Sequence, residues 1–316
     1  MWRHFALCVC TTVLLTVPAP ASPEQNDCSH RTLTVHVKDL QGKPVPGLVA
    51  ADFEAQFRGK PVKILSATPD TRPHRVVILL DASASMAGTW ERPLYLATHA
   101  VDTMPMTAQV ALFVFDTKIK LQLGFSAGRP AIREALRALH FDQNEVSKKV
   151  RGRTAVYDVL LSAIRLLDSP TNSDVLYLIT DAGDNSSDSK PKDVAKALTS
   201  KGAHLFLSLV YPGPFLMSRS DQYLGALDLT ELVQKVGGEF VTPYVNFAYD
   251  PKNPDLFAAS LRTFELSLID DYLLELDLSE PVRKYENWTL KLSKEKRERW
   301  KGARLLYAKE LAPCEP

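Results

Sequence analysis

Three oxygen-bearing side chains alternate directly after an apolar run of strand length. The run covers residues 76–80, and Asp81, Ser83 and Ser85 follow it. Parallel sheets place their ligands beyond the carboxyl ends of their strands. A tight loop at such an end can aim three oxygens at one point. The spacing therefore predicts a site for a small ligand that prefers oxygen donors.

Two further oxygen donors occupy equivalent positions along the chain. Thr154 stands just before a segment of helical pattern, and Asp181 directly follows the apolar run over residues 175–180. Together the five side chains supply two carboxylates and three hydroxyls. Small hard cations such as Mg²⁺ prefer this set, with waters completing an octahedron, and Mn²⁺ and Ca²⁺ are alternatives. The set includes no cysteine or histidine, which argues against zinc or copper.

Two other aspartates are weaker candidates near this set. Asp184 follows Asp181 by three residues and is a possible auxiliary oxygen ligand. The alternative is that its loop merely turns. Asp158 follows Thr154 by one helical turn and could hydrogen-bond to the site, although a solvent-facing aspartate on a helix is an equal possibility.

The elements that must position these residues alternate between strands and helices from residue 74 onward. This alternation predicts a mostly parallel sheet covered by helices, and the apolar runs are those of central strands. Strands are expected over residues 76–80, 110–115, 175–180, 205–210 and 239–242. Helices are expected over residues 93–104, 130–139, 155–167, 191–200, 227–236 and 254–268. The long stretch 211–225 is interpreted as a loop.

One expected strand pair departs from the parallel pattern. Only Asp116 and Thr117 separate the run 110–115 from the alternating run 118–123. Two residues cannot form a parallel crossover, so the second run is predicted to be an antiparallel edge strand. Its alternating lysines suit an edge. The fold class is therefore α/β, Rossmann-like and doubly wound, with one antiparallel edge strand.

The two ends of the chain carry strand patterns of a different kind. Short strands with turn chemistry between them are expected over residues 32–67, and more strands over residues 272–310. Neither end has enough strands for independent stability. We therefore expect the two segments to pack together as one small antiparallel β-domain.

The first residues have the features of an export signal. Two basic residues precede an apolar stretch and a small-residue cleavage site, so residues 1–21 are predicted to be removed. The expected organisation is then a β segment over 22–71, the α/β domain over 72–250 and a helix and β segment over 251–316. The mature chain is expected to be secreted or to lie in the periplasm or cell envelope, without a membrane span.

Two cysteines remain after removal of the leader, one at each end of the mature chain. In an oxidising compartment Cys28 and Cys314 favour a single disulfide. Two free thiols on frayed ends are the alternative.

The overall charge offers no support for nucleic-acid binding. The formal net charge is +1, and the basic run over residues 294–304 is interrupted by two glutamates. We interpret this run as a solvated strand-and-turn edge rather than a phosphate-binding patch.

The set Asp81-x-Ser83-x-Ser85, Thr154 and Asp181 resembles the metal-ion-dependent adhesion site (MIDAS) of von Willebrand factor type A domains. The resemblance covers about residues 72–250. It implies that the first four residues contact the cation directly or nearly so, and that Asp181 binds directly or through water. Relatives have glycine directly after the last aspartate, whereas this sequence has Ala182. Alanine resists a positive φ, so the loop could be shaped differently.

The flanking segments are similar to an exported bacterial family of VWFA-related proteins, of the type found in acidobacteria. The likeness lies in residues 37–61 and in the strand that begins at Tyr272. It extends the resemblance to most of the mature chain.

These observations predict a non-enzymatic adhesion or interaction module. The cation would recruit a carboxylate from a protein or an acidic polysaccharide. The sequence has no nucleophile elbow, zinc-protease motif, phosphate loop or dinucleotide fingerprint. Two alternatives stay open: a scaffold whose metal only rigidifies the loops, and a metal-dependent hydrolase.

Overall fold

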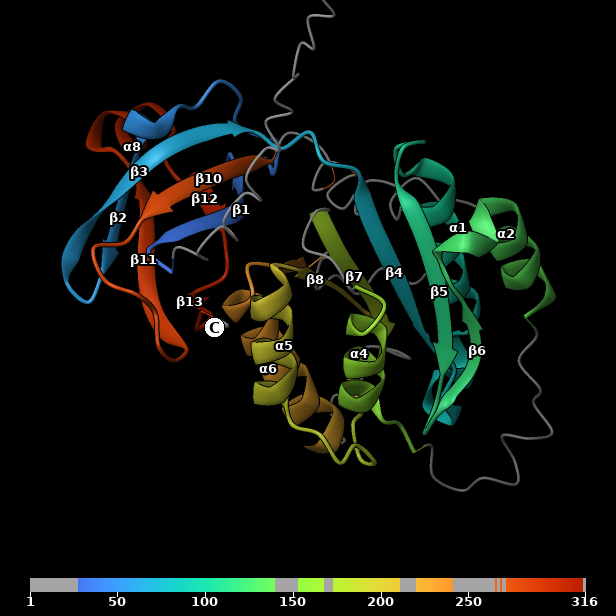
Figure 1. Ribbon diagram of the computed structural model, residues 1–316. Helices are drawn as coiled ribbons and strands as arrows, with labels where there is room; N and C mark the ends of the chain where they lie inside the picture. Colours follow the sequence, from blue (N-terminus) through green and yellow to red (C-terminus); the bar gives the residue numbers. More distant parts are fainter. Residues whose placement is uncertain are drawn as a thin grey trace, which may run out of the picture.

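The structure is a computed structural model that describes residues 28–139, 153–167, 173–210, 220–240, 265, 268 and 271–314. It contains two sheets, one covered by helices and one antiparallel (Figure 1). The predicted leader, residues 1–21, lies outside the described residues. In the part of the chain that is described, no helix is long and apolar enough to cross a membrane.

The helix-covered sheet has six strands in the order β6-β5-β4-β7-β8-β9. These strands are β4 (His74–Asp81), β5 (Gln109–Phe115), β6 (Ile119–Leu123), β7 (Ser173–Thr180), β8 (His204–Leu209) and β9 (Glu239–Phe240). Every pairing is parallel except β5 with β6. The predicted antiparallel edge strand is confirmed.

Helices cover both faces of this sheet, with α1 and α2 on one face and α4, α5 and α6 on the other (Figure 1). Their bounds are α1 (Glu91–Thr103), α2 (Gly128–Ala138), α4 (Val156–Ile164), α5 (Pro191–Lys201) and α6 (Ser220–Lys235). The doubly wound α/β prediction is confirmed. The interpretation of residues 211–225 as a loop is wrong from residue 220 onward, because α6 begins at Ser220. The expected helix over 254–268 lies outside the described residues, apart from Glu265 and Leu268.

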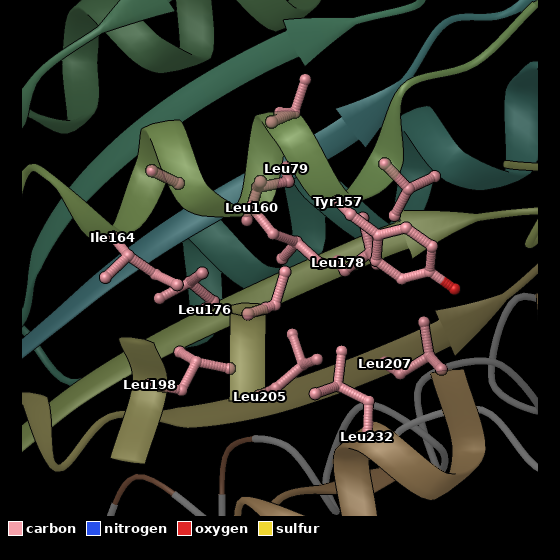
Figure 2. Close-up of a cluster of buried hydrophobic side chains, with 14 of the residues drawn as sticks. Leu79, Tyr157, Leu160, Ile164, Leu176, Leu178, Leu198, Leu205, Leu207 and Leu232 are labelled. Carbon is pink, nitrogen blue, oxygen red and sulfur yellow. The ribbon is translucent and has the colours of Figure 1, made fainter. Parts of the chain in front are cut away.

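The core consists of two apolar layers separated by the sheet. Along β4, Val77 and Leu79 face the layer under α4 to α6, whereas Ile78 and Leu80 face the layer under α1 and α2. Figure 2 shows the first layer, where Leu79, Leu178 and Leu207 come from three neighbouring strands. Burial on both faces explains why these strands are continuously apolar.

The second sheet interleaves the two ends of the chain in the order β12-β1-β10-β3-β2-β11-β13. Its strands are β1 (His30–Lys38), β2 (Phe53–Phe57), β3 (Lys60–Pro69), β10 (Tyr272–Asp277), β11 (Glu286–Leu292), β12 (Arg304–Leu306) and β13 (Glu310–Leu311). Strand β10 lies between β1 and β3, antiparallel to both. The predicted β-domain built from both segments is confirmed.

The basic run near the C-terminus is not a strand edge. Residues Lys294–Arg299 form a short helix, α8, whose N-cap Ser293 accepts a bond from the Lys296 N–H at 3.5 Å. Lysine, arginine and glutamate favour helices, and serine favours the N-cap. The interpretation as a strand-and-turn edge is therefore corrected.

The ends of the second sheet are joined covalently. Cys28 and Cys314 form a disulfide across a sequence separation of 286, with their Cα atoms 5.5 Å apart. The disulfide prediction is confirmed.

The two sheets also share backbone contacts. Val236, after α6, makes a β-bridge with Ala308, and the Lys309 N–H donates to the Lys235 carbonyl at 2.8 Å. A Cβ on Gly237 would lie 2.4 Å from the carbonyl carbon of Tyr307, so only glycine permits this approach.

Candidate metal site

Asp81 is the last residue of β4 and its side chain is fully buried. One carboxylate oxygen accepts the Ser83 N–H at 2.8 Å, and the other accepts the Thr180 hydroxyl at 2.6 Å. These bonds fix the carboxylate at the carboxyl end of the sheet. The sequence analysis did not identify Thr180, whose position at the end of the neighbouring strand β7 is the available signal.

The two serine hydroxyls predicted to share the site do converge. Ser83 Oγ lies 3.0 Å from Ser85 Oγ, where Ser83 directly precedes the 3₁₀ helix η2 (Ala84–Thr89) and Ser85 belongs to its first turn. Ser83 is buried, and Ser85 is partly exposed. The alternation seen in the sequence therefore places two hydroxyls together beside Asp81.

Asp181 follows β7 and is fully buried, and its carboxylate accepts the Gly183 N–H at 3.2 Å. Burial, together with the nearby charge of Asp181, raises the pKa of Asp81 to about 7. The two carboxylates, at the carboxyl ends of the neighbouring parallel strands β4 and β7, are therefore close enough for their charges to interact.

Thr154 is buried and is tied to the loop that follows Asp181. The Thr154 N–H donates to the side-chain oxygen of Asn185 at 3.0 Å, and the Thr154 carbonyl accepts the N–H groups of Asn185 and Ser186, each at 3.1 Å. Sequence analysis did not assign this positioning role to Asn185. Nothing in the local pattern indicates it, because the contact joins segments 31 residues apart.

Asp184 has partners other than the cluster of Asp81 and Asp181. Its carboxylate accepts the Ser187 hydroxyl at 2.6 Å and the Tyr157 N–H at 3.2 Å, in the first turn of α4. It therefore acts as a cap on the helix that follows Thr154. Asp158 accepts the N–H groups of Asp188 and Ser189, both at 3.0 Å, and so binds the same loop.

Ala182 adopts the left-handed conformation, with φ at 69°. Alanine thus adopts a positive φ here, the backbone conformation that glycine takes up most readily. Its carbonyl is packed tightly, since a Cβ on Gly225 of α6 would lie 1.9 Å from the Ala182 oxygen. Strained backbone of this kind costs of order 1–3 kcal/mol and is concentrated at functional sites.

The residues present fit a small divalent cation. Two buried carboxylates repel each other unless one takes up a proton or a cation lies between them, and Asp81 forms no ion pair with a described residue. Among the described residues, no three His, Cys, Asp or Glu side chains are grouped to hold a metal ion. Hydroxyls would therefore complete the donor set, which suits hard cations.

Residues 76–184 match the family model of the von Willebrand factor type A domain. No curated protein sequence matches this chain.

Solved structures with a similar fold are distant. BatB, a conserved hypothetical protein from Bacteroides thetaiotaomicron, is 17% identical over 62% of this chain and 98% of its own, with a TM-score of 0.44. Proximal thread matrix protein 1 from the mussel byssus, solved with a zinc-occupied MIDAS motif, is 19% identical over 66% and 48%, also with a TM-score of 0.44. A von Willebrand factor type A protein from Catenulispora acidiphila is 14% identical over 89% and 73%, with a TM-score of 0.40. Likenesses this distant carry no functional assignment.

Proposed function

Because this chain contains a von Willebrand factor type A domain, we propose that it is an exported, non-enzymatic binding protein of the MIDAS type. The site holds a divalent cation, with Mg²⁺ as the first choice, and recruits a carboxylate from a partner. The partner is a protein or an acidic polysaccharide.

The observation that carries the proposal is the meeting of oxygens at the carboxyl end of the sheet. Buried Asp81 lies beside the paired hydroxyls of Ser83 and Ser85, and close enough to Asp181 for the two charges to interact. These four residues and Thr154 would hold the cation. Asn185 and Thr180 would keep two of them in place.

The donor set explains why an acidic partner is preferred. Two carboxylates at most neutralise a dication, and the remaining donors are uncharged hydroxyls. The cation therefore supplies a coordination position that favours an anionic oxygen over water. Burial of Asp81 and Asp181 lowers the local dielectric and strengthens such contacts.

The chemistry of the serines supports binding rather than hydrolysis. Ser83 and Ser85 bond to each other, and within the described residues no histidine contacts either hydroxyl. An adjacent base is one of the usual means by which a serine nucleophile is activated. The Cys28–Cys314 disulfide supports export, because disulfides persist in oxidising compartments.

A scaffold role is the second candidate, and the loop network favours it. Asp158, Asp184 and Asn185 all fasten the loop after Asp181 to the start of α4. In that case the cation would stiffen these loops without contacting a partner.

Calorimetry of Mg²⁺ binding tests the metal site. The wild type is expected to bind, whereas Asp81→Ala removes binding because it deletes one of two carboxylates. Asp228→Ala, an exposed aspartate on α6, serves as the matched control and keeps wild-type affinity. Absence of Mg²⁺, Mn²⁺ and Ca²⁺ binding by the wild type would refute the proposal.

Partner capture separates adhesion from scaffolding. Immobilised protein is incubated with native cell-envelope extract in Mg²⁺ or in EDTA, and bound material is eluted and identified. Adhesion predicts release by EDTA and no capture by Asp81→Ala. A partner that stays bound under both conditions would support the scaffold role instead.

A further inference from the structure

The β-domain contains a cavity of about 320 Å³ between β11, α8 and the segment that follows α8. Two aromatic rings, Trp300 and Tyr307, contribute to its wall. Aliphatic side chains form the rest of the apolar surface, namely Leu290, Leu292, Leu305 and Ala303. This volume is at the small end of ligand pockets, which suits one or two sugar rings rather than a folded domain.

All charged residues that line the cavity are positive. They are Lys291, Arg297 and Lys309, and no acidic residue is among the lining residues. The ammonium of Lys291 lies 3.7 Å from Glu54, and both side chains are about half exposed, so this pair is weak. Arg297 is exposed on α8. The basic run noted in the sequence therefore presents one of its arginines to a cavity.

Among these positive residues, Lys309 has the surroundings that most favour a bound anion. Its ammonium lies 3.3 Å from the centre of the Tyr307 ring, and it forms no ion pair with any residue that the structure describes. The side chain is partly buried, and burial lowers its pKa to about 8. A partly desolvated cation without a counter-ion is costly, and an anion in the cavity would offset that cost.

We infer that this cavity binds an acidic saccharide, with a carboxylate beside Lys309 and Arg297 and a sugar ring against the partly exposed Trp300. Aromatic faces offer apolar surface of fixed shape, and charged donors orient a carboxylate. The lining residues lie on β11, α8 and the segment after it, and none is a proposed metal ligand. Binding here is therefore independent of the cation and of the proposed function.

Calorimetry with tri-galacturonate as the probe tests the inference on the full chain in EDTA. Binding at roughly millimolar affinity or tighter is expected. Lys309→Gln should weaken it about tenfold, because a charge-assisted hydrogen bond is lost. Arg297→Gln should also weaken binding of the probe. Because Arg297 is at an exposed helix position, this variant is expected to fold normally. Lys301→Gln is the matched control, since Lys301 is exposed and does not line the cavity.

Further measurements distinguish the interactions that could cause binding of the probe. Asp81→Ala should bind tri-galacturonate like the wild type, whatever the outcome at the metal site. Absence of binding in EDTA would overturn the inference, as would equal loss in Lys301→Gln. Equal affinity for neutral maltotriose would exclude a role for the charges. Equal affinity for hexaglutamate would show an acidic-peptide site instead.

Discussion

His36 Nδ1 and the Asp271 carboxylate form a hydrogen bond that is buried where the two sheets meet. His36 belongs to β1, and Asp271 directly precedes β10. The ring of His204, the first residue of β8, lies edge-on to His36 with their centres 4.5 Å apart. One cluster of titratable side chains thus joins the β-domain to the helix-covered sheet.

Further charged groups surround the histidines. His74 and Asp70 are close enough for their charges to act on the pair, and Lys38 and Arg304 bond to the Glu239 carboxylate of β9. Burial, followed by the charge of His36, lowers the pKa of His204 to about 3. Burial also lowers the pKa of His36 and raises that of Asp271 to about 8. All three shifts favour uncharged side chains at this junction.

The first prediction concerns acidification. Because the pKa of His204 is lower in the folded state, its contribution to stability is present above pH 6.5 and is lost as the pH falls toward 3. The free energy of unfolding of the protein then falls by about 2–3 kcal/mol between pH 6.5 and 4.5 on account of this one histidine. Asp271 acts in the opposite sense: its contribution is full below pH 3.8 and is lost as the pH rises from there to about 8.

A comparison of variants isolates the effect of His204. Urea unfolding at pH 7 and pH 4.5 should show a drop in stability that is smaller by about 2 kcal/mol in His204→Gln than in the wild type. His30→Gln, an exposed histidine on β1, should keep the wild-type drop. Equal drops in all three proteins would contradict the assignment.

The second prediction concerns Asn185. Asn185→Ala removes the acceptor for the Thr154 N–H, so Thr154 is held less firmly, by the two bonds to its carbonyl alone. Mg²⁺ affinity should fall about tenfold, as is typical for residues that orient metal ligands. Asn185→Asp keeps the acceptor oxygen and should restore most of the affinity, which a merely structural role would not require. Calorimetry measures the affinity, and the exposed Asp228→Ala serves again as the control.

The third prediction concerns the contact between α6 and the loop after Asp181. Gly225→Ala places a Cβ against the Ala182 carbonyl and should lower the unfolding free energy by about 1–3 kcal/mol. Because the loop that carries Asp181 is displaced, the protein should also bind Mg²⁺ more weakly. Gly124→Ala has open space around it and an ordinary φ, so it should change neither quantity. An unchanged melting temperature in Gly225→Ala would exclude this close approach.

The fourth prediction concerns the disulfide. Replacing both Cys28 and Cys314 with serine frees the ends of the β-domain and should cost up to about 5 kcal/mol on the chain-entropy model. Denaturant unfolding of the oxidised wild type and the double variant measures this cost. Limited proteolysis should cut β1 first in the variant. Equal stability of the two proteins would mean that strand pairing alone fixes the ends.

Much of the helix-covered sheet and its site could be predicted from short stretches of the sequence. Continuous apolar runs mark strands buried on both faces, and the two-residue gap before residue 118 permits only a hairpin. Single residues separate Asp81, Ser83 and Ser85, so one turn is enough to bring their side-chain oxygens together. The start of α6 at Ser220 and the helix α8 were missed, because mixed sequences of this kind are decided by capping and packing.

The sequence by itself determined which oxygens are available for a cation and which sheet edge presents them, because periodicity and spacing are local properties. Only the tertiary structure decided that Asn185 holds Thr154, that Gly225 packs on Ala182 and that His36 meets His204. Each of these contacts joins segments far apart in the chain, and packing rather than local pattern selects them. The bond between His36 and Asp271 spans 235 residues, a distance at which no sequence period can indicate a partner.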